Sequence, residues 1–446
     1  MGCLDEVYKS VEDLSTDFFQ TKACKGMLLA PLNAASSHCS RLKINVDDTK
    51  VRAVYICRDA GCCAHRDNAF SSVPDTVCKC GKVMQSVGQS SQNDGSAASG
   101  DSEDGVFVKG CLKFIITDDL QVAPASTSLM LSLFEKFGVR DPIDLDKEVV
   151  NLSLDKIINL LKRSLTSKQP FTGYYFDVPT PPEDTILDTL PPNLHEQANK
   201  AEQKFDDVKI KVLQAKNNSS LLYAQVGDDF VDLMFGLLSV PLGVMIKTFG
   251  QGYSKGYLDN LYSSINGRCM IPECQSLLLA PRAWPFFGSG ATKILQVEES
   301  APNKVQINSC FKCLKIYGFS TASNCHQKDY LNKKYLCQEI MKSTKLCELN
   351  PKSPTGGGGK GEAYVKGGHM KFMVTNGLRV LPLALSTTLQ VVSDAKIKTE
   401  ELVEKKIYLS KFQVMGLQRA ALMNRDALSS VLLPPKKKKN LKHLRY

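Results

Sequence analysis

The chain has 446 residues, of which 43% are hydrophobic, and a formal net charge of +10. This length and composition exclude one ordinary domain and predict a folded protein with two or more domains. Six positive charges lie in the last eleven residues, on Lys436, Lys437, Lys438, Lys439, Lys442 and Arg445. Without them the net charge is +4 (10 minus 6), which is too small to indicate a nucleic-acid-binding surface on the body of the protein.

The N-terminus has no basic start followed by an apolar segment, so we expect an intracellular protein of the cytoplasm or nucleus, not a secreted one. In a reducing compartment the 16 cysteines are expected to be small buried side chains, metal ligands or reactive thiols. The longest uncharged apolar run, residues 233–246, has 14 residues and is interrupted by Pro241. Because a membrane span needs about 20 residues, the run predicts a buried helix pair and no span.

Short motifs recur in order along the chain: residues 2–11 as 256–265, 28–31 as 278–281, 108–110 as 365–367, and 113–117 as 371–375. The offsets stay between 250 and 258, so the sequence predicts two tandem copies of one module. Residues 208–250 have no counterpart before Met1, so the first copy is expected to be truncated. In each copy the Gly-x-Leu-Asp start should open a helix, and the Leu-Leu-Ala-Pro and Val-Lys-Gly motifs should lie on strands.

The first copy contains a Cys-rich insertion at about residues 55–84, which we expect to be short and loop-like. It carries four thiols in two close pairs: Cys57, Cys62, Cys78 and Cys80. Such a set can hold a tetrahedral zinc ion, and metal binding supplies folding energy that a small segment with little core lacks. Cys63 and His65 are alternative ligands. Unliganded cysteines and redox chemistry are the alternatives to a structural zinc site.

The second copy begins with a predicted hairpin of strands 208–213 and 221–226. A helix over residues 230–238 and a second one from Pro241 to near Gly250 should follow. Residues 370–374 repeat the pattern with a strand, a turn, a short strand and a helix-length segment. We expect each module to consist of two strand-strand-helix halves, which makes the fold class α+β.

The second Cys-rich insertion, at about residues 308–347, resembles the first in part. Cys310 and Cys337 fall where Cys57 and Cys80 do, but Tyr335 replaces Cys78. A possible second metal site would use four cysteines, with His326 as a further candidate: Cys310, Cys313, Cys325 and Cys337. Retention and loss of this site both remain open. A site that changes its ligands in this way is expected to be structural rather than catalytic.

The domain boundaries follow from these segments: a truncated first module at 1–176, a linker at 177–207, a second module at 208–433 and a basic tail at 434–446. Within the modules, two further segments have the composition of connectors. Residues 86–105 are rich in Ser, Gly and Asp and are expected to be disordered, and the Gly-rich residues 351–362 occupy the equivalent place.

The Gly-x-Leu-Asp start, the Leu-Leu-Ala-Pro motif, the Cys-x-Cys-Gly segment at residues 78–81 and the Val-Lys-Gly motif resemble a plant family catalogued as domain of unknown function 674. The resemblance covers nearly all of the chain except the linkers and the tail. It implies tandem modules and a plant source, and it implies no activity or catalytic residue.

We predict no catalytic residue, and the leading hypothesis is a non-enzymatic module that binds an unidentified protein partner and contains structural zinc. One alternative is a nuclear or nucleic-acid-binding regulator, with nucleic acid contacted by the basic tail at Lys436, Lys437, Lys438 and Lys439. Another is a thiol enzyme of unrecognised type. Lipidation of Gly2 is not expected, because Glu6 stands where the acylation motif needs Ser or Thr.

Overall fold

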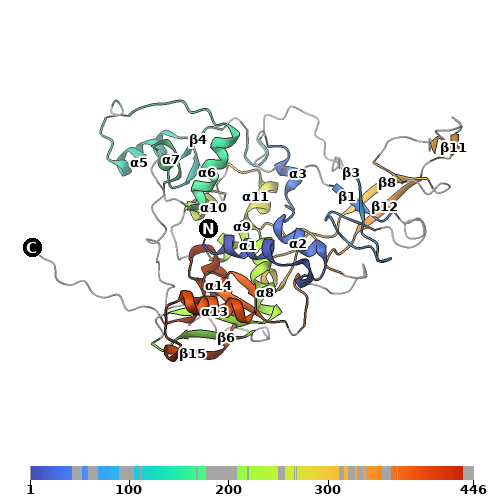
Figure 1. Cartoon of the computed structure of the whole chain (residues 1–446). Coiled ribbons are helices and arrows are strands. Elements are labelled where there is room, and N and C mark those ends of the chain that lie inside the picture. Colours follow the sequence, from blue (N-terminus) through green and yellow to red (C-terminus); the bar gives the residue numbers. More distant parts are fainter. Residues whose placement is uncertain are drawn as a thin grey trace, which may run out of the picture.

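The structure is a computed structural model that describes residues 2–42, 53–58, 69–89, 105–110, 112–141, 143, 145–166, 169–176, 208–217, 220–249, 257–265, 267, 269–310, 316–319, 327–328, 335–337, 340, 342–353, 363–368 and 370–434. Helices and several sheets are present, so the predicted α+β class is confirmed. The larger sheets have five and six strands. In Figure 1 the five-strand sheet and its helices lie at the bottom, the six-strand sheet lies to the right, and a smaller region lies at the top. We call residues 2–176 the first half and 208–434 the second half.

The five-strand sheet belongs to the second half and has the order β14-β13-β7-β6-β15. Its strands are antiparallel: β6 (Val208–Ala215), β7 (Leu221–Val226), β13 (Phe372–Thr375), β14 (Val380–Pro382) and β15 (Leu402–Leu409). The predicted hairpin is therefore confirmed. Val208, Ile210 and Val212 alternate along β6 and are buried in the main core, because alternate residues of a strand point to the same face.

Helices of the second half accompany this sheet: α8 (Asp228–Phe235), the 3-10 turn η5 (Gly236–Ser239), α9 (Leu242–Phe249), α13 (Leu385–Asp394), the 3-10 turn η6 (Thr399–Glu401), α14 (Lys411–Met423) and α15 (Ala427–Leu432). The predicted helix pair around Pro241 is confirmed. No single helix among the described residues is long and apolar enough to cross a membrane. One bent pair, Asp228–Ser239 with Leu242–Phe249 at 109°, passes that test by length and composition only.

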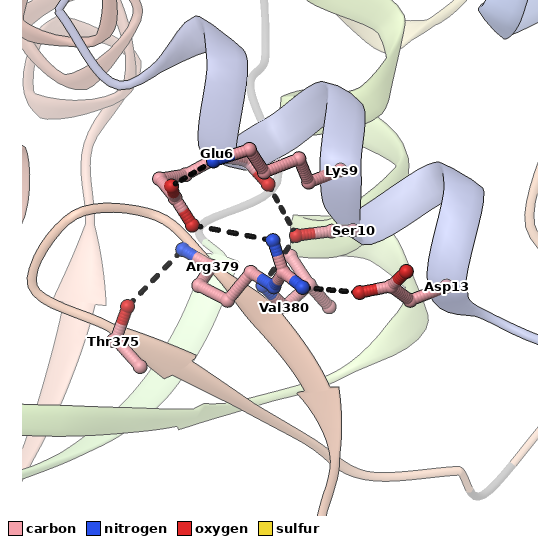
Figure 2. A network of polar contacts seen from close by, with 7 residues as sticks. All are labelled: Glu6, Lys9, Ser10, Asp13, Thr375, Arg379 and Val380. Atoms are coloured by element: carbon pink, nitrogen blue, oxygen red, sulfur yellow. Dashed lines mark hydrogen bonds and ion pairs between the residues drawn. The ribbon is translucent and has the colours of Figure 1, made fainter.

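The N-terminal elements of the first half, α1 (Leu4–Asp13), η1 (Thr16–Phe18) and α2 (Lys22–Leu29), pack on the second half. Figure 2 shows the contact of α1 with the turn before β14. The Ser10 hydroxyl accepts the Val380 N–H at 2.9 Å, and the Arg379 guanidinium bonds to Glu6 at 3.3 Å and also to Asp13. The helix is thus held by a buried hydrogen bond and a forked ion pair.

The reciprocal contact joins α10 (Tyr257–Ser264) of the second half to the small region of the first half. That region contains β4 (Phe114–Ile116), β5 (Val122–Pro124), α5 (Thr127–Phe137), α6 (Leu154–Thr166) and α7 (Pro170–Tyr175). The Ser264 hydroxyl accepts the Val122 N–H at 2.9 Å. This bond matches that of Ser10 with Val380, so α1 of the first half and α10 of the second half each pack on the opposite half.

The Leu-Leu-Ala-Pro motifs were predicted to lie on strands, and this prediction is wrong. Leu28 and Leu29 end α2, and the second motif ends α11 (Pro272–Leu279). A short apolar run does not distinguish a strand from a buried helix segment. The Val-Lys-Gly motifs form only isolated bridges, Val108 with Met270 and Val365 with Phe19, which again link the two halves.

The six-strand sheet takes strands from both Cys-rich insertions, so the expectation that the first is loop-like is wrong for its described strand residues. Its order is β3-β1-β2-β12-β8-β9. The strands are β1 (Ala53–Ile56), β2 (Ala69–Ser71), β3 (Gln85–Gln89), β8 (Lys304–Ser309), β9 (Ile316–Gly318) and β12 (Lys342–Glu348). Three strands come from each half, and β2 and β12 pair in parallel across the junction. The edge strands β3 and β9 lie close to each other, so the sheet curls toward a barrel.

This sheet has its own apolar core, to which both halves contribute: Val54, Ile56, Phe70, Val305, Ile307 and Leu346. Strands this short need partners, and here each half supplies partners for the other. The remaining elements are α3 (Ser36–Cys39), α12 (Gly290–Ile294) and a two-strand ladder of β10 (Gln327–Lys328) and β11 (Tyr335–Cys337).

Two predicted connectors are partly structured. Residues 86–89 belong to β3 rather than to a disordered linker, because they pair with β1. Lys352 and Ser353, at the start of the Gly-rich connector, are buried. Residues 90–104, 177–207, 354–362 and 435–446 lie outside the described residues. The predicted division at 177–207 stays a prediction, although the two halves share a sheet and a core.

Candidate metal centre

The turn between β2 and β3 positions two of the predicted ligands. Cys78 N–H donates to the Lys82 carbonyl at 2.8 Å, and Gly81 N–H donates to the Cys78 carbonyl at 2.8 Å. Gly81 has a φ of +83°, a left-handed conformation that favours glycine. A bridge between Val77 and Val83 closes the turn. The Cys-x-Cys-Gly motif is therefore a tight knuckle.

Strand β1 ends directly before Cys57, which faces this knuckle. The sulfur atoms of Cys57 and Cys80 are 3.5 Å apart, and those of Cys57, Cys78 and Cys80 all lie within 4.8 Å of one another. A disulfide bond would bring two sulfurs to about 2.05 Å. Thiolates at about 2.3 Å from a tetrahedral zinc ion are about 3.8 Å apart, which these separations approach.

The cluster is partly enclosed. Cys57 and Cys78 are buried and pack with Met84 and Leu349, whereas Cys80 is exposed. Leu349 belongs to the second half, directly after β12, so both halves enclose the sulfurs. This is the only group of three or more Cys, His, Asp or Glu side chains with metal-binding spacing in the described part of the chain.

The fourth predicted ligand, Cys62, lies outside the described residues, as do the alternatives Cys63 and His65. The basic residues Lys436, Lys437, Lys438 and Lys439 also lie outside them. The structure thus brings together the three predicted ligands of the first site that it describes.

The family model described as "Protein of unknown function (DUF674)" matches residues 1–443. The chain belongs to the DUF674 family. Neither a curated protein nor a solved structure matches it.

The second predicted site has two sulfurs together in the described residues. Cys310 and Cys337 are buried, and their sulfur atoms are 3.5 Å apart, as in the Cys57–Cys80 pair. Cys313 and Cys325 lie outside the described residues. The strand registers also correspond, because β3 pairs with β1 as β12 pairs with β8. The residues of β8 lie 253 positions after those of β1, and the residues of β12 lie 257 positions after those of β3. The equivalence predicted for the two insertions is thus seen in their backbone pairing.

A buried polar cluster was not predicted from the sequence. Asp232 on α8 accepts the Tyr364 and Val365 N–H groups at 2.6 and 3.2 Å. The Lys352 ammonium lies 3.8 Å from the centre of the Tyr364 ring and donates to the Gly288 carbonyl. Burial raises the pKa of Asp232, and it also raises the pKa of Tyr364 well above its usual value.

This cluster joins segments rather than exposing a reactive group. The Tyr364 hydroxyl donates to the Phe287 carbonyl at 2.7 Å, so its polar groups are paired within the protein. Lys352 falls in a segment predicted to be a connector, which concealed its role. The available signal was a lysine four residues before a run of glycines, which has no specific meaning.

Two other cysteines bear on the thiol-enzyme hypothesis. Burial raises the pKa of Cys3 to about 11, and burial also raises the pKa of Cys24. A nucleophilic cysteine needs a lowered pKa, because the thiolate is the reactive form. Cys3 and Cys24 are therefore packing residues.

Proposed function

We propose that this DUF674 protein is a non-enzymatic protein-interaction scaffold whose six-strand sheet is held by a structural zinc ion. The observation that carries the proposal is the convergence of the Cys57, Cys78 and Cys80 sulfurs within 4.8 Å. These residues would bind the metal, and Cys62 is proposed as the fourth ligand. The intracellular location stays part of the proposal, since thiolate ligands require a reducing compartment.

Zinc is the metal that best suits this donor set. Thiolates are soft ligands, and structural zinc sites are closed by four protein ligands. The knuckle presents two sulfurs from one turn, and Cys57 adds a third from the neighbouring strand. The metal would thereby cross-link β1 to the β2–β3 turn.

The sheet has a physical need for such a cross-link. The junction between the halves is made by β2 and β12, for which two residue pairs are in register, Cys347 with Ala69 and Glu348 with Phe70. Its apolar core is also small. Because metal affinity adds to the free energy of folding, a bound zinc ion would stabilise the sheet through β1 and β2.

Native mass spectrometry with matched variants tests the proposal. Cys80→Ser removes an exposed ligand, and Cys347→Ser removes an exposed cysteine of the same sheet that is outside the cluster. We expect one zinc ion per chain in the wild type and in Cys347→Ser, and none in Cys80→Ser. When free zinc is 1,000 times Kd, thermal unfolding should show that the free energy of unfolding of Cys80→Ser is about 4 kcal/mol lower than that of the wild type.

Equal metal content in all three proteins would contradict the assignment of the ligands. Absence of metal from the wild type, purified under reducing conditions, would overturn the zinc scaffold. A second zinc ion that is lost in Cys310→Ser would show that the second Cys-rich insertion also binds metal.

A further inference from the structure

Residues 112–176 and residues 370–432 have the same local construction. The hairpin β4–β5 pairs Phe114 with Pro124 and Ile116 with Val122, and β13–β14 pairs Phe372 with Pro382 and Val374 with Val380. Every one of these residues has its counterpart 258 positions on. Leu120 and Leu378, also 258 apart, both have the uncommon positive φ, at 58° and 62°.

The helices that follow also correspond. The bounds of α6 and α7, shifted by 257 residues, are those of α14 and α15. The Asp118 carboxylate accepts the Thr172 N–H at 3.0 Å at the start of α7, and the Asn376 side-chain oxygen accepts the Ser429 N–H at 2.8 Å near the start of α15. The two regions thus place equivalent helices on equivalent hairpins.

In the second half, two more strands, β6 and β7, lie between the β13–β14 hairpin and strand β15, which leads into helix α14. Strand β7 pairs with the outer edge of β13, and β6 pairs with β15 along all eight residues of that strand. Leu409 at the end of β15 is fully buried, and so is Leu417 on α14. The β6–β7 hairpin therefore completes both the sheet and the core beneath it.

The first half shows no such strands among the residues that the structure describes. No strand pairs with β4 where β7 pairs with β13, and residues 145–152, the counterpart of β15, form no ladder. Leu152, the counterpart of Leu409, is 51% exposed, and Ile116 on β4 is also 51% exposed. Apolar side chains that are buried in one region thus lie open in the other.

We propose that this surface, composed of the β4 edge, residues 145–152 and the adjoining face of α6, binds a β-hairpin from another polypeptide. We call it the hairpin slot. Exposed strand edges with apolar neighbours recruit partner strands by backbone hydrogen bonding. The proposal specifies the partner class of the interaction function proposed above and rests on that function, but it does not depend on the metal.

The second half indicates the chemistry of the occupant. The occupant has two antiparallel strands, one paired with β4 and one paired with residues 145–152. Its apolar side chains alternate as Val208, Ile210 and Val212 do on β6. A second copy of this chain is a poor donor, because its own β6 and β7 are already paired on both sides. The occupant is therefore a hairpin of a different protein.

The segment that would receive the hairpin is already anchored. The Tyr175 hydroxyl donates to the Glu148 carboxylate at 2.8 Å, which ties residues 145–152 to α7. Ser153 then accepts the Lys156 N–H at the start of α6, as Ser410 accepts the Gln413 N–H at the start of α14. Anchoring at this end lowers the entropy lost when the segment becomes a strand.

The test uses the full chain and a cyclic peptide of residues 210–226, closed through an added Asn-Gly turn so that the hairpin is formed before binding. We expect saturable binding with a Kd below about 1 mM. Hydrogen exchange should slow at residues 114–116 and 145–152. The same peptide with Ile210→Asp should not bind.

Two chain variants check the register. Leu152→Asp introduces a charge at the counterpart of buried Leu409 and should weaken binding at least about tenfold, which is a difference of 1.4 kcal/mol. Val149→Lys should bind as the wild type does, because its counterpart Lys406 is exposed. Zinc content should be equal in all of these proteins, which separates a failure here from a failure of the metal site.

Three results would overturn the proposal. The first is no slowing of exchange at residues 145–152 with excess cyclic peptide, and the second is equal binding by Leu152→Asp. The third is protection at residues 145–152 that rises with protein concentration in the absence of peptide, because that would assign the slot to a second copy of this chain.

Discussion

Residues 402–409 and residues 145–152 occupy equivalent places in two regions, yet the first segment is strand β15 and the second forms no ladder. Both lie between an equivalent hairpin and an equivalent helix. The difference is the β6–β7 hairpin, which pairs with β15 and has no counterpart beside residues 145–152 in the part of the chain that the structure describes.

The comparison shows that strand formation here depends on pairing more than on local preference. The segment 145–152 contains Val149 and Val150, which favour strands, whereas β15 contains consecutive lysines. Strand propensity is largely a measure of fit to a sheet surface. Without a neighbouring strand, residues 145–152 stay exposed.

The largest contrast should come from one substitution at both equivalent positions. Leu409→Ala leaves a cavity in the core and should lower the free energy of unfolding by about 2–5 kcal/mol. Leu152→Ala removes an exposed side chain and should change it by no more than about 0.5 kcal/mol. Urea unfolding followed by circular dichroism measures both. Equal losses would mean that the slot is closed in solution.

A smaller contrast is expected for the serines on α1 and α10 that accept a backbone N–H from the opposite half. Ser10 is fully buried, so Ser10→Ala should leave the Val380 N–H without a partner and lower stability by about 1–3 kcal/mol. Ser264 is half-buried, so Ser264→Ala should cost less than about 1 kcal/mol because water can replace the hydroxyl. If Ser264→Ala has the larger effect, the small region is packed more tightly than its exposure indicates.

The smallest expected effect is a pH dependence of the free energy of unfolding, which arises from Asp232 in the second half. Burial raises the pKa of Asp232 above its ordinary value of 3.8, so the folded state binds the proton more readily than the unfolded state. Stability from this group therefore rises as the pH falls through the raised pKa toward 3.8. Asp232→Asn keeps an acceptor for Tyr364 N–H and should remove this slope.

Unfolding of wild type and Asp232→Asn across that pH range measures the slope. The control is Asp229→Asn, because Asp229 lies on the same helix, α8, and is exposed rather than buried. An identical pH profile for wild type and Asp232→Asn would show that Asp232 titrates alike in both states.

Local patterns were reliable where one segment supplies its own partner. The β6–β7 hairpin follows from alternation around a polar turn, and the helix pair around Pro241 follows from helix-start rules. The Cys57, Cys78 and Cys80 cluster follows from two close pairs in one segment. Each of these patterns spans fewer than about 30 residues, so short-range geometry suffices.

Structural features that depend on partners far along the chain could not be predicted from local patterns. The sequence predicts a loop-like first Cys-rich insertion and not its strand β2, because β2 finds its partner β12 far along the chain. Lys352 was assigned to a connector although it contacts Tyr364, and the Leu-Leu-Ala-Pro motifs end helices. The spacing of the repeated motifs carries no information on which half each element packs against.

The amino-acid sequence by itself determined the α+β class, the hairpin of the second half, the DUF674 family resemblance and the three cysteines of the candidate metal centre, because these depend on residue type and short spacing. The predicted duplication is supported by contacts that recur at 257 or 258 residues and stays a prediction. Only the tertiary structure decided that α1 and α10 each pack on the opposite half, that the halves share a sheet, and that residues 145–152 lie exposed. The burial of apolar side chains depends on segments that are far apart in the chain, so no local pattern predicts which segments pack together.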